Sequence, residues 1–245
     1  DVYTDSTIRH FHRWPDWLIN DIEVALEDWK MAPSFNVFKD LFLIKWRIIA
    51  ILTARWHSPD NIERWLKLIN KEILNKEEKE EQIENIIKNY NLDTRNQKEV
   101  LNYYFWKVIY YMAASNKHFC KYWNIPHDIS PAIKKTYAMN KYISDMPKIL
   151  QRVAWISIDT MVANNVSLSL GFSDDSTNNI IEMFKHFAEE SFKSTLYLQY
   201  KIRLYFTWDK SQYQNLIDKL NSFKYENIWL EFHEQENQLD IKIIS

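Results

Sequence analysis

The sequence predicts an α/β fold with a largely parallel β-sheet, and two features of the 245-residue chain support this prediction. Apolar segments of strand length alternate with helical patterns of roughly 10 to 20 residues, which is typical of βα units. Some of these strand candidates also run directly into a helix start, as strands do when a helix connects them to a parallel neighbour. No internal repeat or low-complexity segment stands out.

Each element follows from a local pattern. Residues 47–53 form the clearest strand, because the "IIAIL" within it is apolar and rich in β-branched side chains. The helix at residues 58–75 begins with Ser58-Pro59-Asp60, which are typical of an N-cap, a first-turn proline and a first-turn acid. The other expected helices are residues 35–43, 76–88, 132–150, 177–190 and 209–223, and Ser115 is placed to cap a further helix. The other expected strands are residues 107–113, 166–172, part of 196–207, 229–232 and 239–244.

The composition limits the classes of protein that the chain can represent. Its 31 Lys+Arg and 33 Asp+Glu nearly balance, whereas proteins that bind nucleic acid or anionic membranes normally carry a basic excess or patch. We therefore expect no nucleic-acid and no membrane partner. The single cysteine, Cys120, excludes an internal disulfide and a cysteine-based zinc site. The longest apolar run, residues 41–54, is too short for a membrane span and contains Lys45 and Arg47, so we expect a soluble, cytoplasmic protein.

Glycine and tryptophan occur in abnormal numbers. The chain has one glycine, Gly171, where ordinary usage of about 7% would give about 17, and it has eleven tryptophans. Trp46 and Trp208 lie between expected helices and strands, and Trp56 lies in the turn before Ser58, all places where glycine is common. A genome that reads UGA as glycine, translated with a table that reads it as tryptophan, would produce this pattern. The hypothesis also covers Trp123, between periodic segments, and Trp229, at the start of an expected strand. The alternative is a protein that is naturally rich in tryptophan.

Polar residues follow two of the expected strands, at the end where α/β sheets bind ligands. Thr53 ends the first strand and offers a hydroxyl before a helix N-terminus, which suits a phosphate oxygen. Asp174 and Asp175 follow a later strand, and adjacent carboxylates suit Mg²⁺. Lys134 and Lys135, early in an expected helix, are the lysines placed to neutralise phosphate charge. Each feature alone also has an ordinary explanation as a turn, a strand end or a solvent-facing side chain.

In combination and in this order, these features resemble a known family. The segments "IIAILTARWHSPDNI" and "SLSLGFSDDSTNNI" are similar to motifs two and four of the haloacid dehalogenase (HAD) superfamily. They look most like a phosphatase-like group with a Thr-Ala-Arg-Gly-His-Ser-Pro turn and a Gly-Phe-Ser-Asp-Asp segment. The segments "ALEDWKMAPSFNVFKDLF" and "IYYMAASNKHFCKYWNIP" also resemble that group, so the resemblance spans roughly residues 20–205. Glycine stands in the group's turn where this chain has Trp56, which agrees with the codon hypothesis.

The resemblance implies a Rossmann-like, three-layer HAD fold, in which residues 1–245 form a single domain with room for a cap-like insertion within residues 70–130. It implies that Thr53 binds the transferring phosphoryl group. Lys134 or Lys135 would be the motif-three lysine that steadies the nucleophile and the phosphate, and the sequence does not choose between them. The remaining implied site residues are Asp174 and Asp175 as the Mg²⁺ ligands, and Arg55, His57 and Ser58 in the substrate-binding turn.

The implied function is that of a Mg²⁺-dependent HAD-type phosphatase acting on a phosphorylated small molecule or a phosphoprotein, through an aspartyl-phosphate. The family's first motif, Asp-x-Asp-x-Thr/Val, has no match in the chain. The nearest text, "DVYTDST", has Tyr3 where the second Asp should stand. We expect that the motif either precedes Asp1 or has been lost, and we expect no turnover from the chain as written. The alternative function is a non-catalytic HAD-like domain that binds a phosphorylated ligand or a protein partner.

The codon hypothesis can be tested on the protein from its native source. We expect peptide sequencing by mass spectrometry to find glycine at positions 46, 56 and 208. Recovery of tryptophan at these three positions would show that the chain is naturally rich in tryptophan.

Overall fold

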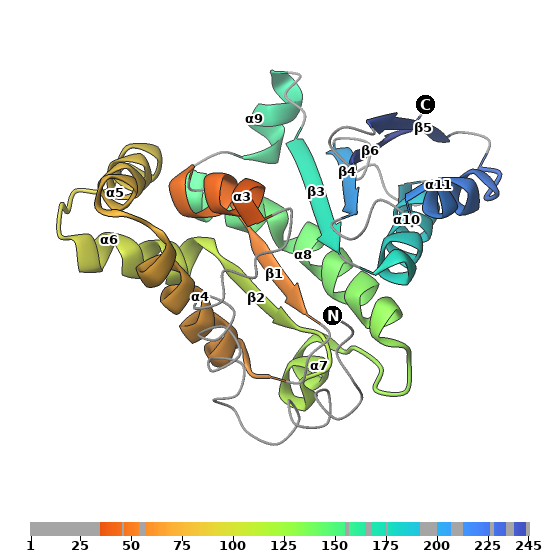
Figure 1. The fold of residues 1–245 in the computed structure, drawn as a ribbon, viewed down its shortest axis with the longest axis horizontal. Helices are drawn as coiled ribbons and strands as arrows, with labels where there is room; N and C mark the ends of the chain where they lie inside the picture. The colour runs from red at the N-terminus through yellow and green to blue at the C-terminus, as the bar shows by residue number, and fades with distance from the viewer. Residues whose placement is uncertain are drawn as a thin grey trace. The chain divides into compact units, whose positions relative to one another are not determined.

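The protein forms two compact units in the computed structural model. Unit 1 comprises Asp1–Ile129 with Ala138–Trp155, and unit 2 comprises Ser130–Tyr137 with Ile156–Ser245. Figure 1 labels the helices and strands along the chain. The residues that the structure describes are 35–45, 47–53, 57–154, 157–164, 168–174, 176–191, 200–206, 213–225, 228–233 and 238–243.

The expected mixed α/β class is confirmed. The strands are β1 (Ala50–Thr53), β2 (Tyr110–Ala113), β3 (Leu168–Asp174), β4 (Tyr200–Phe206), β5 (Ile228–His233) and β6 (Gln238–Ile243). Pairing is parallel between β1 and β2 and between β3 and β4, whereas β4 with β6 and β5 with β6 are antiparallel. The expected parallel pairing therefore holds for the first four strands, and the two C-terminal strands form a hairpin-like addition.

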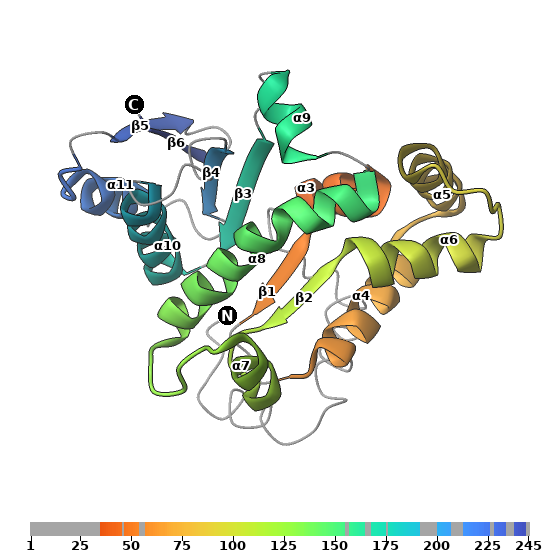
Figure 2. The same ribbon diagram turned by 180° about the vertical axis from the view of Figure 1, so that it is seen from behind.

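Unit 1 is built around the parallel pair β1–β2. Its helices are α3 (Phe35–Phe38), η1 (Lys39–Ile44), α4 (Pro59–Ile73), α5 (Lys76–Tyr90), α6 (Gln97–Tyr103), η2 (Tyr104–Val108), α7 (Lys117–Trp123) and, from Ala138 onward, α8 (Pro131–Ala154). The helix α4 packs against β2. The later turns of α8 run beside β2 (Figure 2), where the ring centroids of Tyr142 and Tyr110 lie 5.5 Å apart. The sheet of unit 1 is thus lined by helices that the sequence places both before and after β2.

The helix α4 begins as its sequence predicts. The Ser58 hydroxyl oxygen accepts a hydrogen bond from the Asn61 amide at 3.3 Å, and Pro59 occupies the first helical position. Ile62, Leu66 and Ile69 are buried, as their spacing of three and four residues requires for one helix face. The cap and the apolar stripe together confirm this helix.

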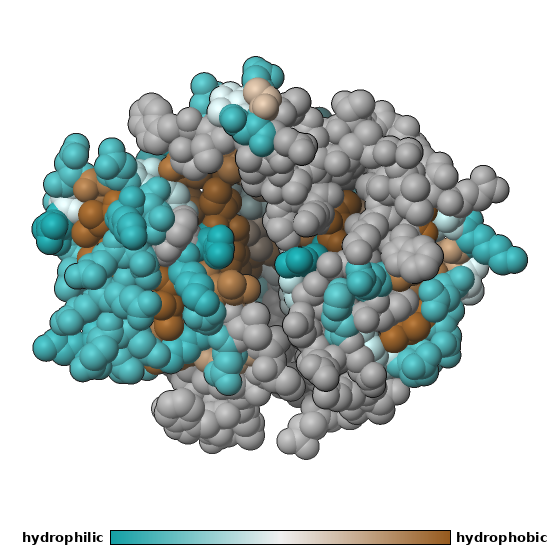
Figure 3. Space-filling view, turned by 90° about the horizontal axis from the view of Figure 1, so that it is seen from above, coloured by the Kyte–Doolittle hydropathy of each residue, from teal (hydrophilic) through white to brown (hydrophobic). Residues whose placement is uncertain are grey.

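The charged side of helix α5 faces solvent, as its sequence predicts. The helix begins with a reciprocal capping box between Asn75 and Glu78. Glu77, Glu80 and Glu81 are exposed. In Figure 3 the side of the molecule on which α5 lies is largely hydrophilic, with smaller hydrophobic patches. The few buried side chains of α5 pack inward, on α6 and η1.

The aromatic run at 103–105, which the sequence predicts to be core or sheet face, lies in the helices α6 and η2, and Tyr104 and Phe105 belong to the core. Tyr104 is fully buried, and its hydroxyl lies 3.0 Å from the Phe42 carbonyl oxygen and 2.9 Å from the Arg47 carbonyl oxygen. These two carbonyls end η1 and precede β1, so the Tyr104 hydroxyl satisfies backbone groups where no ladder partner exists. The core position predicted for this run is confirmed. Its helical conformation was not predicted, because aromatic side chains are common in strands and in buried helices alike.

Of residues 70–130, where a cap-like insertion was expected, residues 70–129 belong to unit 1 and Ser130 belongs to unit 2. They supply α5, α6, η2, β2 and α7, and β2 pairs with β1 in a register that joins Thr53 to Ala113. At least the end of this segment is therefore part of the sheet. The description of residues 1–245 as one domain with an insertion stays a prediction.

Unit 2 holds a four-stranded sheet in the order β3-β4-β6-β5. Leu170 and Phe172 on β3 and Ile202 and Leu204 on β4 are buried, with the alternation expected for one covered face. The helix α10 (Thr177–Ser191) packs on β3 and β4 and contacts α11 (Tyr213–Asn221). The short helix α9 (Ile158–Ala163) precedes β3. Unit 2 therefore presents the C-terminal end of β3 directly to the start of α10.

Two of the tryptophans expected to replace glycine can be placed. Trp123 is the last residue of α7, and the left-handed conformation at that helix end belongs to Asn124, with φ 53°. Trp229 lies within β5 and pairs with Lys242. Neither backbone position requires glycine, so the structure gives no reason to replace either tryptophan. The remaining tryptophans of this hypothesis lie outside the described residues, Trp46, Trp56 and Trp208 among them.

None of the helices in the described part of the chain combines the length and the apolar content that crossing a membrane requires.

The buried tyrosines predict how stability depends on pH. Burial raises the pKa of Tyr104, and also that of Tyr90 and Tyr111, above the usual value of about 10. The unfolded chain therefore loses these protons first as pH rises, and the contribution to stability is complete below about pH 10 and is lost above it. We expect the free energy of unfolding to fall above pH 10 by up to about 1.4 kcal/mol per pH unit for each buried tyrosine.

The variant Tyr104→Phe isolates one of these groups. We expect it to lower the free energy of unfolding at pH 7 by about 1–3 kcal/mol, because two buried carbonyls lose their donor, and to make the alkaline decline shallower. Urea unfolding between pH 7 and pH 11 measures both effects. Tyr122→Phe, at an exposed position, is the control and should leave the stability at pH 7 unchanged. A variant that declines as steeply as the parent would contradict the assignment.

Candidate functional site

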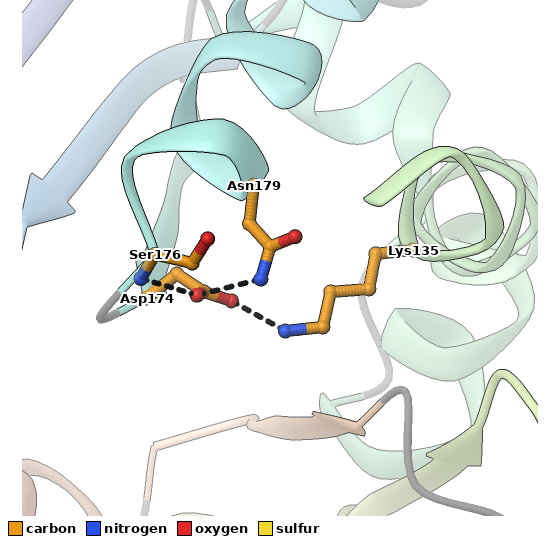
Figure 4. A network of polar contacts seen from close by, with 4 residues as sticks. All are labelled: Lys135, Asp174, Ser176 and Asn179. Atoms are coloured by element: carbon orange, nitrogen blue, oxygen red, sulfur yellow. Dashed lines mark hydrogen bonds and ion pairs between the residues drawn. The ribbon is translucent and has the colours of Figure 1, made fainter. Parts of the chain in front are cut away.

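Asp174 and Lys135 form the most buried ion pair among the described residues, and both belong to unit 2. Asp174 is the last residue of β3, and Lys135 lies in the second turn of α8, 39 residues earlier in the chain. The Lys135 ammonium nitrogen lies 2.6 Å from Asp174 Oδ2 (Figure 4). The two residues are 9% and 8% exposed. A pair so removed from water persists only when each charge is well compensated.

The turn after β3 holds the other oxygen of the same carboxylate. Asp174 Oδ1 accepts a hydrogen bond from the Ser176 amide at 2.9 Å and from the Asn179 side-chain amide at 2.8 Å (Figure 4). The bond to the amide two residues on is an Asx turn, which short carboxylates form readily. The Ile180 amide then donates to the Ser176 carbonyl oxygen and starts α10. The carboxylate is thereby fixed between a strand end and a helix N-terminus.

The helix α8, which carries Lys135, begins with a capped first turn. The Ser130 hydroxyl oxygen accepts a hydrogen bond from the Ile133 amide at 3.3 Å, and Pro131 opens the helix. Lys134 is half-buried, and the contact with Asp174 is made by Lys135. The sequence left these two lysines as alternatives. Lys135 is the one that contacts Asp174, and which of them is the motif-three lysine stays a prediction.

The Asp174 carboxylate has few lone-pair positions left for a further donor or a cation. A carboxylate offers about four lone-pair positions, and Asp174 uses three of them on Lys135, Ser176 and Asn179. One position stays open to a hard cation, for which carboxylate oxygen is the preferred ligand. The described residues include no cluster of three or more His, Cys, Asp or Glu side chains that could hold a metal. Asp175, the second expected ligand, lies outside the described part of the chain.

The other expected site residues belong to unit 1. Thr53 ends β1, and its carbonyl oxygen accepts a hydrogen bond from the Ala114 amide at 2.8 Å. Ser58 is engaged as the N-cap of α4, and His57 beside it is 1% exposed. Arg55 lies outside the described residues. The turn that resembles motif two therefore contains a strand-end hydroxyl and a capped helix start, as the sequence predicts.

Asn179 is a site residue that sequence reasoning missed. Its side-chain amide holds the carboxylate of Asp174 from the first turn of α10. The signal was present in "DDSTNN", where Asn follows the strand-end Asp by five residues and so returns to it across a single helical turn. Polar residues are common at helix starts, so this spacing does not by itself single out Asn179.

A double-mutant cycle tests whether Lys135 and Asp174 act as a pair. We expect Lys135→Met to lower the free energy of unfolding by about 3–5 kcal/mol, because it leaves Asp174 buried without its partner charge. The double variant Lys135→Met with Asp174→Asn should lose less than the sum of the two single variants. Chemical denaturation measures all three.

Lys134→Met is the matched control for this cycle. It changes the neighbouring lysine on the same helix turn and should alter the stability by less than about 0.5 kcal/mol. If Lys134→Met and Lys135→Met lowered the free energy of unfolding equally, the assignment would be contradicted. The cause would then be a weakened start of α8 and not the loss of the ion pair.

Comparisons with known proteins do not assign a function, so the function is argued from the chemistry of the site. No known family, curated protein or solved structure matches this chain. The resemblance to the HAD superfamily stays an expectation from the two motifs, and the function is argued from Lys135, Asp174 and the turn that holds them.

Proposed function

We propose that this protein is a HAD-type, Mg²⁺-dependent phosphatase-like protein that acts on a phosphorylated small molecule or a phosphoprotein. The observation that carries the proposal is the buried pair of Lys135 and Asp174 at the C-terminal end of a parallel strand. In α/β sheets this end is where ligands bind. A buried lysine and a carboxylate at this place are the two charges that phosphoryl transfer needs, one for the phosphate and one for its metal ion.

The start of α10 supports an anionic ligand at the same place. A helix N-terminus has backbone N–H groups without intrahelical partners and a partial positive charge. The 15-residue α10 begins directly after the turn that holds Asp174. Together with the Lys135 ammonium, this helix end favours a phosphate group over a neutral ligand.

Asp174 and Asp175 are the residues that would hold Mg²⁺. When bound, the ion neutralises charge on the phosphoryl oxygens. Asp174 retains one lone-pair position for this purpose, and its orientation is fixed by Ser176 and Asn179. Asn179 is thus a positioning residue, because it acts through the carboxylate and not on the substrate.

Lys135 has two tasks in this proposal. In the free protein it neutralises Asp174, which makes burial of the carboxylate tolerable. With a phosphorylated ligand present, its ammonium group has three donors and can serve the carboxylate and a phosphate oxygen together. Thr53 keeps the phosphoryl-binding role that the resemblance implies for it.

The proposal separates binding from turnover. The family reaction uses an aspartate nucleophile from Asp-x-Asp, and the printed sequence contains no match to that motif. We therefore expect the 245-residue chain to bind phosphate and Mg²⁺, and a form that carries the motif to hydrolyse phosphate esters. The alternative function is a non-catalytic domain that binds a phosphorylated ligand or a protein partner. It is favoured by the way Lys135 and Asp174 already neutralise each other.

Hydrolysis of p-nitrophenyl phosphate by the full-length protein tests the proposal. We expect Mg²⁺-dependent activity that falls by about 100-fold or more in the variant Asp174→Asn with Asp175→Asn, because the metal is held by these carboxylates. Asp159→Asn changes an exposed aspartate of α9 and is the control. Activity that survives the double variant would refute the metal assignment. Mg²⁺ and phosphate binding without hydrolysis, measured by titration calorimetry, would establish the non-catalytic alternative.

A further inference from the structure

Unit 1 contains a groove that the proposed function does not use. It encloses about 490 Å³ and is partly open to solvent, a size within the range of roughly 300–1,000 Å³ found for small-molecule sites. Three elements line it: β2 through Tyr110, the end of α7 through Tyr122 and Trp123, and one face of α8. We propose that this groove binds a nucleotide, with the base on the aromatic rings and the phosphate on the cations of α8.

The α8 face of the groove carries an excess of positive charge. Lys141, Asp145, Lys148 and Arg152 line the groove, and their spacing of four, three and four residues places them on one helix face. Asp145 lies 3.5 Å from the Lys141 ammonium and 4.0 Å from that of Lys148. Three cations and one carboxylate give these four lining side chains a net charge of about +2, which favours a doubly charged anion.

Arg152 is held in place before any ligand arrives. One of its guanidinium nitrogens donates a hydrogen bond to the Lys107 carbonyl oxygen at 2.7 Å, and its central carbon lies 5.9 Å from the centroid of the Tyr110 ring. These two contacts leave other N–H groups of the planar guanidinium available. A cation ordered in this way loses less conformational entropy on binding than a free lysine would.

The aromatic side of the groove combines a solvent-exposed ring with a ring that is held by a neighbour. Tyr122 is 82% exposed, although it sits next to the buried residues of α7. Trp123 stacks on Phe119 with ring centroids 4.9 Å apart and an interplanar angle of 17°, and the Lys141 ammonium lies 5.8 Å from its ring. An anchored ring beside an exposed one is a platform on which a planar base can stack.

The two halves of the groove together select the ligand class. A phosphate ion would leave Tyr122 and Trp123 without a role, and an uncharged ring would leave the lysines without one. A nucleoside monophosphate supplies one planar ring and a phosphate that carries nearly two negative charges at pH 7. A single groove of this size accommodates one nucleotide, and the near-neutral charge of the whole chain does not favour a long polyanion.

Calorimetric titration of the 245-residue chain with AMP tests the proposal. We expect AMP to bind at least about tenfold more tightly than adenosine, which lacks the phosphate, and than ribose 5-phosphate, which lacks the base. AMP binding should also weaken below about pH 6, where its phosphate gains a proton and loses charge. Equal affinity for AMP and either fragment would overturn the proposal. Tighter binding of a single-stranded oligonucleotide that displaces AMP would also overturn it in favour of a nucleic-acid surface.

Exposed substitutions locate the site with little risk to folding. Tyr122→Ala and Lys148→Ala should each weaken AMP binding by about tenfold, through lost stacking and lost charge. Tyr137→Ala and Lys98→Ala change an exposed tyrosine and an exposed lysine elsewhere and are the matched controls. The Trp123 indole N–H resonance, assigned with Trp123→Phe, should shift on addition of AMP. Unchanged affinity in both groove variants, or equal weakening in the controls, would overturn the assignment.

Discussion

Two opposite charges removed from water set the constraint on which unit 2 depends. Lys135 and Asp174 are almost fully buried, and either one alone would be costly to desolvate. Their attraction ties the start of α8 to the end of β3, and the second oxygen of the carboxylate orders the turn into α10. The strand end, the helix start and the candidate site are therefore set by a single carboxylate.

The sequence predicts most of the described elements, because their signals are local. The cap at Ser58, the apolar stripe of α4 and the β-branched run before Thr53 each lie within a few residues, and the structure confirms the corresponding helix and strand. The helices α6, η2 and α9 were not predicted. Tyr104 shows the reason: its burial depends on carbonyls of Phe42 and Arg47, about sixty residues earlier, which no local pattern reveals.

The candidate site, too, could be predicted only in part from the sequence. Its residue types, a lysine and a strand-end carboxylate in unit 2, follow from their order along the chain. The choice of Lys135 over Lys134 does not, because it depends on which side of a helix turn faces a strand 39 residues later. The groove of unit 1 was not predicted at all. Its rings come from β2 and α7 and its cations from α8, and only the folded chain brings them together.

The helix α8 has a consequence for how the protein is made. Its first residues complete unit 2 and its later residues complete unit 1, so the two units are interleaved along the chain. During synthesis, unit 1 lacks the later turns of α8 until residue 155 has left the ribosome. Unit 2 must keep residues 130–137 available until β3 has been made. No single cut in the chain releases one whole unit from the other, so we expect the polypeptide to acquire its protection against proteases late, and nearly at once.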